Sequence, residues 1–328
     1  MFSSRRRTVC ASLAAAAAAP GAVWAQQQFS PDRPVRFVVP FPPGGGADQV
    51  ARQLSEELRG RLGRPMIIEN KPGAGGLLGL QEIGKSAPDG HTIGHFISGH
   101  TTLQTLFKRT TLLDLIAPVC RLSFYNLGIF VAEDSRYQSL QSLLDAIRAN
   151  PGRVTMGISG IGNPGHIAWE LMRARLGDAY LVNAVPMKGS PEVLLAMRGG
   201  QLDFSIAILG VFGAYLQKGG GVRALAVTGG ERAKLFPDIP TAAQAGLAGF
   251  SYMAWDGIAA PAGTPPGIVS AWYELINAGM QTAGYRSVAE RLAMTPAPSP
   301  STEEFGRFVR TELQREEALV REGKLKLS

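Results

Sequence analysis

Two glycine-rich stretches carry the residues with the clearest chemical potential. Residues 40–48 read PFPPGGGAD, and residues 157–166 read GISGIGNPGH. Each stretch follows an apolar run and precedes a segment with apolar residues at helical spacing, so each is predicted to be a loop between a strand and a helix. Such a loop presents unpaired backbone N–H groups at the positive end of a helix, where an anion can bind. The two stretches therefore point to anion binding.

Two further glycine patterns match nucleotide-binding motifs without the required context. Residues 79–86, GLQEIGKS, match the P-loop pattern but fall inside a helix predicted from Leu77 to Ala87, whereas the motif works as a loop between a strand and a helix. Residues 160–165, GIGNPG, match the dinucleotide pattern, yet Asp178 precedes the next predicted strand instead of following it. We therefore expect no ATP, no NAD and no other cofactor.

The nucleophilic and basic residues form no catalytic or metal set in the sequence. His91 and His95 are two strand periods apart, but no nearby Cys, Asp or Glu completes a metal set, and hydrogen-bonded histidines are the simpler interpretation. No G-x-S-x-G elbow surrounds Ser159, and no acid is evident to orient His166. Asp203 either braces a strand end or contacts a ligand. We expect no enzymatic activity, with an exported enzyme acting on a small carboxylate as the alternative.

The first 25 residues of the 328-residue chain have the pattern of a cleaved export signal. They combine a basic start, an alanine-rich apolar stretch and a small-residue exit, which predicts periplasmic localisation by Sec or twin-arginine export. Cleavage would remove three arginines and no acid, so the formal charge of +7 would fall to +4. This mildly basic chain has no block of like charge that would suggest nucleic-acid binding. Cys120 would then be the single cysteine, so no internal disulfide is expected.

Strand-like and helix-like segments alternate along the rest of the chain. Alternation of this kind predicts an α/β fold with parallel strands covered by helices on both faces. Two stretches, residues 120–126 and 249–257, are predicted to be extended crossovers between two similar lobes. Residues 26–125 plus 251–328 are predicted to form lobe 1, and residues 126–250 lobe 2. Ligands bind beyond the carboxyl ends of strands in open α/β sheets, so the cleft between the lobes is the expected site.

Seven segments, in the same order along the chain, resemble the exported solute-binding proteins of tripartite tricarboxylate transporters, also called Bug proteins and expanded in Bordetella and its relatives. The resemblance covers nearly all of the chain after residue 25. It implies a type II periplasmic-binding fold whose two α/β lobes close on an amino acid, a dicarboxylate or a tricarboxylate. It also implies delivery to the membrane permease of the transporter or to a signalling partner. We expect a monomer. The segments are RFVVPFPPGGGADQVAR, PMIIENKPGAGGLLG, APDGHTIG, GISGIGNPGHIAWELM, VPMKGSPEVLLAMRGGQLDFSI, VRALAVTGGERAKLFPDIPTAAQAGLAGF and APAGTPPGIV.

The same resemblance implies which residues hold the ligand. The loop after the first strand and the matching loop of lobe 2 pinch one carboxylate with backbone N–H groups and ordered water, and two further segments line the cleft and approach the distal end of the ligand. Four or five hydrogen bonds to a charged group would supply roughly the 8 kcal/mol of a micromolar site after ordering costs. With Phe41 and Asp203 added, which the resemblance does not include, the predicted ligand-binding residues are Phe41, Pro42, Pro43, Gly44, Gly45, Gly46, Ala47, Asp48, Ser98, Gly99, His100, Thr101, Ser159, Gly160, Ile161, Gly162, Asn163, His166, Lys188, Gly189 and Asp203.

Three departures from the family pattern bear on the ligand. Ala47 stands where the family commonly has Thr or Ser, and Met187 stands where Tyr is usual. The segment TTLLDL, residues 110–115, is shorter and less polar than its counterparts. A more apolar or aromatic acid is therefore compatible with this chain.

Overall fold

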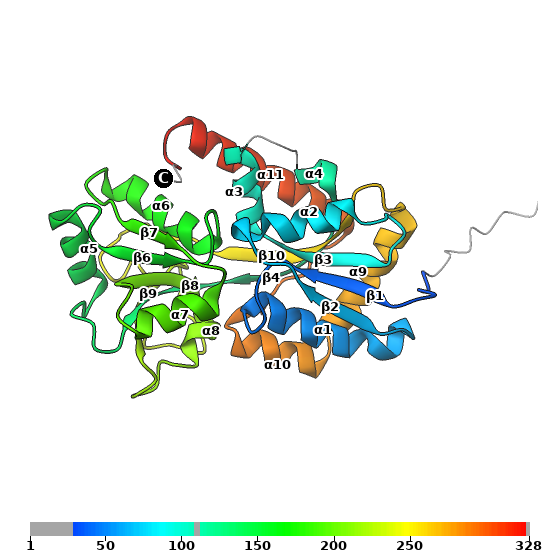
Figure 1. Ribbon diagram of the computed structural model, residues 1–328, viewed down its shortest axis with the longest axis horizontal. Coiled ribbons are helices and arrows are strands. Elements are labelled where there is room, and N and C mark those ends of the chain that lie inside the picture. The colour runs from blue at the N-terminus through cyan, green and yellow to red at the C-terminus, as the bar shows by residue number, and fades with distance from the viewer. Residues whose placement is uncertain (1–28, 108–111, 326–328) are drawn as a thin grey trace, which may run out of the picture.

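A computed structural model describes residues 29–107 and 112–325 of the chain as two α/β lobes (Figure 1). Each lobe is built on one mixed sheet with helices on both faces. This architecture confirms the predicted fold class. The predicted export signal, residues 1–25, lies outside the described residues.

The first sheet has six strands in the order β11-β4-β10-β3-β1-β2. Strands β1, β2 and β3 are parallel, and β10 lies antiparallel between β3 and β4. The short β11 pairs antiparallel with the outer side of β4. The strand bounds are β1 Val35–Val39, β2 Met66–Asn70, β3 Thr92–Ile97, β4 Ile116–Tyr125, β10 Ala254–Pro261 and β11 Met294–Pro296.

The second sheet has five strands in the order β7-β6-β8-β5-β9. Strands β6, β7 and β8 are parallel, whereas β5 lies antiparallel between β8 and β9. The strand bounds are β5 Leu127–Ala132, β6 Thr155–Ile158, β7 Asn183–Pro186, β8 Phe204–Ile208 and β9 Val222–Val227.

The chain crosses between the sheets twice. It passes from β4 directly into β5 at Asn126, and it returns between the end of β9 and the start of β10. Each sheet therefore contains an antiparallel strand, β10 or β5, which follows a crossing of the chain. The predicted crossover stretches are largely strand: residues 120–125 belong to β4 and residues 254–257 to β10.

Helices cover both faces of both sheets (Figure 1). In the first lobe α1, α9 and α10 pack on one face and α2 and α11 on the other, and in the second lobe α5 and α6 lie opposite α7 and α8. Among the described residues, no helix is long and apolar enough to cross a membrane. The helix bounds are α1 Gly46–Leu62, η1 Ala74–Gly76, α2 Leu77–Lys85, α3 Ser98–Phe107, α4 Leu112–Leu115, α5 Leu140–Ala149, α6 Pro164–Leu176, α7 Ser190–Arg198, α8 Leu209–Gly213, α9 Pro266–Met280, α10 Ala283–Arg291 and α11 Thr302–Arg321.

Local sequence signals account for the helices next to the cleft. The apolar residues of α1 recur at helical spacing and are buried from Val50 to Leu62, and α1 ends where Gly63 takes a left-handed conformation. Asn163 caps α6 by accepting a hydrogen bond from the His166 N–H. Residues 79–85 lie within α2, so the P-loop match is a helix, as the sequence indicated.

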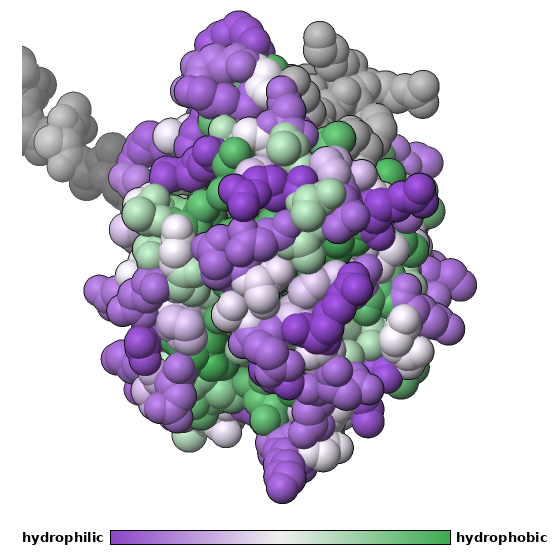
Figure 2. Space-filling view, turned by 90° about the vertical axis from the view of Figure 1, so that its left-hand side faces the viewer, coloured by the Kyte–Doolittle hydropathy of each residue, from purple (hydrophilic) through white to green (hydrophobic). Residues whose placement is uncertain are grey.

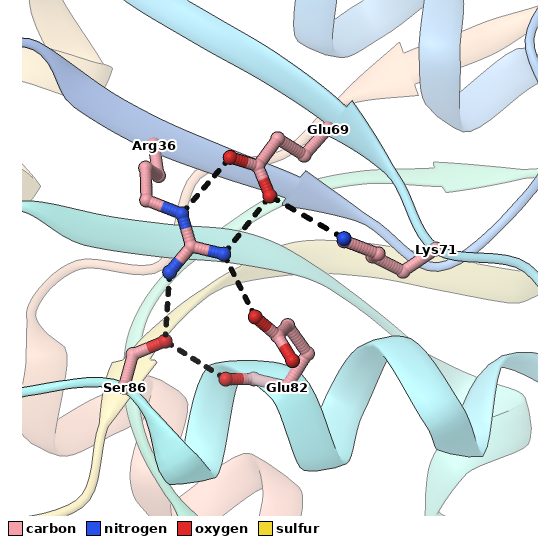
Figure 3. A network of polar contacts seen from close by, with 5 residues as sticks. All are labelled: Arg36, Glu69, Lys71, Glu82 and Ser86. Carbon is pink, nitrogen blue, oxygen red and sulfur yellow. Dashed lines mark hydrogen bonds and ion pairs between the residues drawn. The ribbon is translucent and has the colours of Figure 1, made fainter.

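A polar network fixes α2 against the edge of the first sheet (Figure 3). Arg36 of β1 donates to both carboxylate oxygens of Glu69 on β2, at 3.0 and 2.9 Å, and to Glu82 of α2 at 2.8 Å. The hydrogen bonds from Arg36, against partial desolvation, lower the pKa of the Glu69 carboxyl. Ser86 accepts a longer bond from Arg36 and donates to the Glu82 carbonyl oxygen. The network holds α2, and with it the preceding glycine turn, in a fixed position at the cleft.

The end of the second lobe away from the first is a predominantly polar surface (Figure 2). Hydrophilic side chains cover most of this face, and the hydrophobic ones lie in small patches between them. Most hydrophobic side chains of this lobe are instead buried in its core, around Trp169 and Phe204 on one side of the sheet and Phe130 and Phe212 on the other.

Candidate functional site

A small cavity between the lobes collects the first turns of three helices. Residues 45–47 begin α1, residues 163–165 begin α6, and Ser190 begins α7; all of them line this cavity, which we call the inner cavity and whose volume is about 60 Å³. That is room for a few water molecules or one carboxylate group. The other lining residues are Phe41, Pro42, His95, Ile97, Tyr125, Leu127, Ser159, Ile206, Ala207, Ile208, Asp256 and Met294.

The helix ends at the inner cavity offer backbone donors. The first N–H groups of a helix have no acceptor within the helix, and the N-cap residues of α1 and α7, Gly45 and Gly189, provide no side-chain cap. The helix dipoles also place partial positive charge at these ends. The N-termini of α1 of the first lobe and of α6 and α7 of the second therefore border the same small volume; at the α6 end Pro164 has no N–H, and the His166 N–H is bonded to Asn163.

A larger cavity, which we call the outer chamber, opens beside the inner cavity with a volume of about 620 Å³. Its lining is mainly apolar, with Lys188, Glu192, His100 and two glutamines as the polar members. The loop of residues 159–163 contributes to both linings, with Ser159 and Asn163 at the inner cavity and Gly160 and Ile161 at the outer chamber. The remaining lining residues are Gly73, Ala74, Gly75, Leu77, Leu80, Gln81, Leu103, Gln104, Leu112, Leu115, Gly160, Ile161, Pro186 and Met187.

The two lobes touch across the cleft through glycine. Gly75 of the first lobe has a φ of 67°, and a Cβ there would lie 2.2 Å from the carbonyl oxygen of Ile161 in the second lobe. A Cβ on Gly160 would in turn lie 2.7 Å from the Gly75 Cα atom. Elsewhere along the interface the Gly210 N–H donates to the Leu292 carbonyl oxygen at 3.2 Å. The lobes are therefore closed on one another, and the contact between Gly75 and Ile161 leaves no space for a side chain.

Asp48 fixes the first glycine loop instead of facing the cavity. Its Oδ2 atom accepts from the Gly44 N–H and from Arg52, both at 2.9 Å, and its Oδ1 atom accepts from Asn70 at 3.0 Å. Burial opposes ionisation, but the bonds from Arg52, Gly44 and Asn70 prevail and lower the pKa of the Asp48 carboxyl. The charged Asp48 therefore shapes the loop that carries the α1 N-terminus.

Two buried histidines support the loops as neutral groups. Burial, together with nearby Arg173, lowers the pKa of His166 to about 4, and its Nδ1 atom accepts the Gly162 N–H at 3.2 Å. Burial and then His95 lower the pKa of His100 to about 3, and its Nδ1 atom lies 3.4 Å from the Ile97 nitrogen, which donates to it. Neutral histidines bonded this way are loop supports, since their charge is absent at physiological pH.

The structure brings part of the predicted set to the cavities. Seven predicted residues line the inner cavity: Phe41, Pro42, Gly45, Gly46, Ala47, Ser159 and Asn163. Four line the outer chamber: His100, Gly160, Ile161 and Lys188. The remaining ten line neither, namely Pro43, Gly44, Asp48, Ser98, Gly99, Thr101, Gly162, His166, Gly189 and Asp203.

Asp203 lies outside both cavities, and its side chain braces the second sheet. Its Oδ2 atom accepts from both the N–H and the hydroxyl of Thr155 at 2.8 Å, and its Oδ1 atom accepts from the Tyr137 hydroxyl at 3.3 Å. Asp203 thus joins β8 to β6 from a position just before β8. Of the two interpretations that the sequence left open, the strand brace matches these contacts.

Sequence reasoning missed the residues that the first sheet contributes to the inner cavity. His95 of β3 and Asp256 of β10 both line it, and their side chains form a buried pair with His95 Nε2 2.9 Å from Asp256 Oδ2. Asp256 had no sequence signal, because its partner lies 161 residues away. Among the described residues no group of three His, Cys, Asp or Glu side chains is placed to hold a metal ion.

Comparison with known proteins places these features in a family. The family model described as tripartite tricarboxylate transporter family receptor matches residues 50–325. Protein BugT of Bordetella pertussis is 31% identical over 304 residues, which are 90% of this chain and 91% of BugT.

Solved structures agree in fold. MatC from Rhodopseudomonas palustris with bound malate has 29% identity and a TM-score of 0.82, covering 88% of this chain and 99% of MatC. A second R. palustris protein, solved with adipate, has 28% identity and a TM-score of 0.81, covering 89% of this chain and 97% of that protein. The periplasmic binding protein BugD gives a TM-score of 0.81 at 27% identity, covering 89% of this chain and 98% of BugD. With its two closed lobes and matching sequence, the chain belongs to the tripartite tricarboxylate transporter receptor family of periplasmic solute-binding proteins.

Proposed function

We propose that this protein is a periplasmic receptor that captures a small organic carboxylate in the inner cavity. The observation that carries the proposal is the convergence of the α1, α6 and α7 N-termini, from both lobes, on that cavity. Each hydrogen bond to a carboxylate contributes about 1.5–3 kcal/mol, and a helix N-terminus adds about 0.3–1 kcal/mol. Because the donors come from two lobes, the ligand stabilises the closed form over the open one.

The outer chamber holds the remainder of the ligand in this proposal. Its leucine, methionine and proline side chains favour an aliphatic or aromatic body. Lys188 offers a positive charge to a second carboxylate at the far end of a longer ligand. Malate and adipate in the related structures are carboxylates with such a second acid group. The proposed ligand class is therefore a mono- or dicarboxylate with an apolar segment, and amino acids and tricarboxylates belong in the same test.

We propose the same lobe boundaries and the same periplasmic location that the sequence predicts. Residues 26–125 plus 251–328 form lobe 1, residues 126–250 form lobe 2, and residues 1–25 direct export to the periplasm. The strand order supports these boundaries, because β1–β4, β10 and β11 make one sheet and β5–β9 the other. The receptor works as a monomer and passes its ligand to a transporter permease or a signalling partner.

An exported carboxylate-processing enzyme is the less supported alternative. Ser123, Asp256 and His95 resemble the residue types of a hydrolase triad, but Asp256 stands between the other two. In a hydrolase the histidine bridges serine and aspartate, so that it can take the serine proton. Ser123 donates to Asp256 instead, and among the described residues it has no hydrogen bond to a histidine that could take its proton.

Thermal unfolding of the purified protein with a ligand panel tests the proposal. The panel contains acetate, benzoate, malate, adipate, citrate and amino acids, with ATP and NAD as controls. A ligand at about 100 times its dissociation constant stabilises the fold by about 2.7 kcal/mol, which is a readily measured shift. Stabilisation by a carboxylate and not by the nucleotides supports the receptor function. A response to nucleotides alone, or conversion of a carboxylate to product, would reject it.

A further inference from the structure

A line of polar side chains crosses the first sheet beneath the inner cavity. Ser123 of β4, Asp256 of β10 and His95 of β3 stand on three adjacent strands, and each side chain is almost fully buried. Ser123 Oγ donates to Asp256 Oδ1, and His95 Nε2 lies 2.9 Å from Asp256 Oδ2. These contacts join a serine, a carboxylate and an imidazole inside an otherwise apolar face of the sheet.

Hydrogen-bond accounting leaves one ring nitrogen of His95 for a ligand. An ionised carboxylate only accepts, so His95 Nε2 must carry a proton to bond to Asp256. His95 Nδ1 is buried and has no hydrogen-bond partner within the described chain. His95 lines the inner cavity, as do Asp256 and Ile97, the latter on the same face of β3 as His95. His95 therefore brings to the lining of the inner cavity a buried imidazole nitrogen for which the described chain supplies no hydrogen-bond partner.

The charge of the ligand decides whether the occupied site favours a protonated or an unprotonated His95 Nδ1 atom. A ligand carboxylate in the inner cavity adds a second negative charge beside Asp256, and in the described part of the chain His95 is the ion-pair partner of Asp256. When a proton taken up with the ligand leaves both ring nitrogens of His95 protonated, the His95–Asp256 pair becomes neutral and the ligand's negative charge is the one that remains. The His95 Nδ1–H group is then a donor that joins the backbone donors of the three helix ends.

The other titratable neighbours on the elements packed around this pair supply no positive charge to it. Burial raises the pKa of the Cys120 thiol to about 11 and raises the pKa values of two tyrosines well above the usual range. Burial also lowers the pKa of His100 to about 3. Arg52 is already paired with Asp48. These neighbours are Cys120 and Tyr125 of β4, Tyr285 of α10, His100 of α3, and the Asp48–Arg52 pair of α1.

We propose that His95, held by Asp256, is a ligand-contacting residue whose Nδ1–H donates to a carboxylate oxygen in the inner cavity, so that the protein takes up its ligand together with a proton. The proton comes from solvent and resides on His95, and it leaves when the ligand leaves. The inference rests on the proposed carboxylate receptor function and adds to it a charged side-chain contact. It makes the carboxylate, and not its neutral amide, the group that the inner cavity selects.

Titration calorimetry with malate and adipate as probes tests the inference. Each probe is titrated at about pH 6 and about pH 8, a range in which histidine changes charge, in two buffers of different protonation enthalpy. The wild-type protein should take up about one proton per ligand at the higher pH, and its affinity should fall by up to about tenfold for each pH unit. The matched variants are His95→Gln, which keeps a donor to Asp256 but has no group at the Nδ1 position, and Asp256→Asn, which removes the charge that holds the proton.

Both variants should lose proton uptake and most of the pH dependence of binding. His91→Gln is the control, because His91 lies near Asp32 and Asp89, away from the inner cavity, and should behave as wild type. The nitrogen NMR signals of His95 in the wild-type protein give a second measurement that needs no variant. With probe bound, both ring nitrogens should be protonated.

Wild-type binding without proton uptake, or with His95 Nδ1 unprotonated in the complex, overturns the inference and leaves the receptor function intact. If the His95→Gln variant binds the probes as the wild type does, with the same pH dependence, the inference is likewise overturned and the receptor function is left intact. Failure of the wild type to bind any carboxylate of the panel rejects the receptor function itself, and the inference falls with it. The wild-type titration therefore separates the two failures.

Discussion

Replacing Gly75 with alanine should hold the two lobes apart and weaken carboxylate binding. The added Cβ would lie 2.2 Å from the Ile161 carbonyl oxygen, whereas ordinary van der Waals contact begins at 3.4 Å. The second lobe must therefore retreat by about 1 Å before the closed form is free of overlap. A retreat of this size lengthens the bonds from the α6 and α7 ends to a carboxylate held at α1. Losing one such bond costs about 1.5–3 kcal/mol, or about 10- to 150-fold in affinity.

Gly63→Ala is the matched control for the backbone. Gly63 has a φ of 64°, close to the 67° of Gly75, and no atom lies within 4 Å of a Cβ built on it. In both variants the left-handed backbone conformation of the new alanine lowers the free energy of unfolding by about 1–2 kcal/mol. Only in Gly75→Ala does the added Cβ overlap with the opposite lobe. The difference between them therefore isolates closure from backbone strain.

Calorimetry with malate and adipate measures the affinity, and small-angle scattering at saturating ligand measures how far the lobes close. Gly75→Ala should bind at least about tenfold more weakly than Gly63→Ala and should remain more extended when saturated. Equal affinities in the two variants, with equal scattering profiles, would refute the claim that the closed lobes hold the ligand jointly.

Three further predictions concern the polar side chains of Glu316, Asn163 and Asp203. Burial, against bonds from Thr101 and Thr102, raises the pKa of Glu316 on α11 to about 8, so the folded protein holds a proton that the unfolded chain releases near pH 4.5. Stability should thus fall by up to about 1.4 kcal/mol per pH unit as pH rises between these values, and denaturant unfolding of Glu316→Gln should lack this slope. Asn163→Ala removes the α6 cap and should cost about 1 kcal/mol in denaturant unfolding, with weaker carboxylate binding in calorimetry. Asp203→Asn should cost about 1–3 kcal/mol of stability and leave carboxylate affinity unchanged; a selective loss of affinity would restore its ligand-contact interpretation.

Much of the architecture was predictable because its signals are local. Apolar residues at helical spacing placed α1 and α2, and the polar cap residues Ser139 and Asn163 mark the starts of α5 and α6. The same short-range pattern placed the glycine loops before α1 and α6 and predicts anion binding at them. Alternating strands and helices then indicated an α/β fold, which the two sheets confirm. Each of these signals spans only a few residues, the range over which propensity, capping and periodicity act.

The composition of the site depended on which strands lie side by side. Asp256 meets His95 and Ser123 only because β10 returns from the second lobe and inserts between β3 and β4 in a defined register. Its two hydrogen-bond partners are 161 and 133 residues away, so no spacing of residues in the sequence predicts these contacts. Asp203 is the opposite case. Its place after a glycine turn suggests a ligand contact, yet its side chain bonds to Thr155 of the neighbouring strand. The sequence by itself therefore determined the elements, the loops and their backbone donors. Tertiary structure alone decided which side chains share the cavity, because strand order and register bring together residues that no local interaction connects.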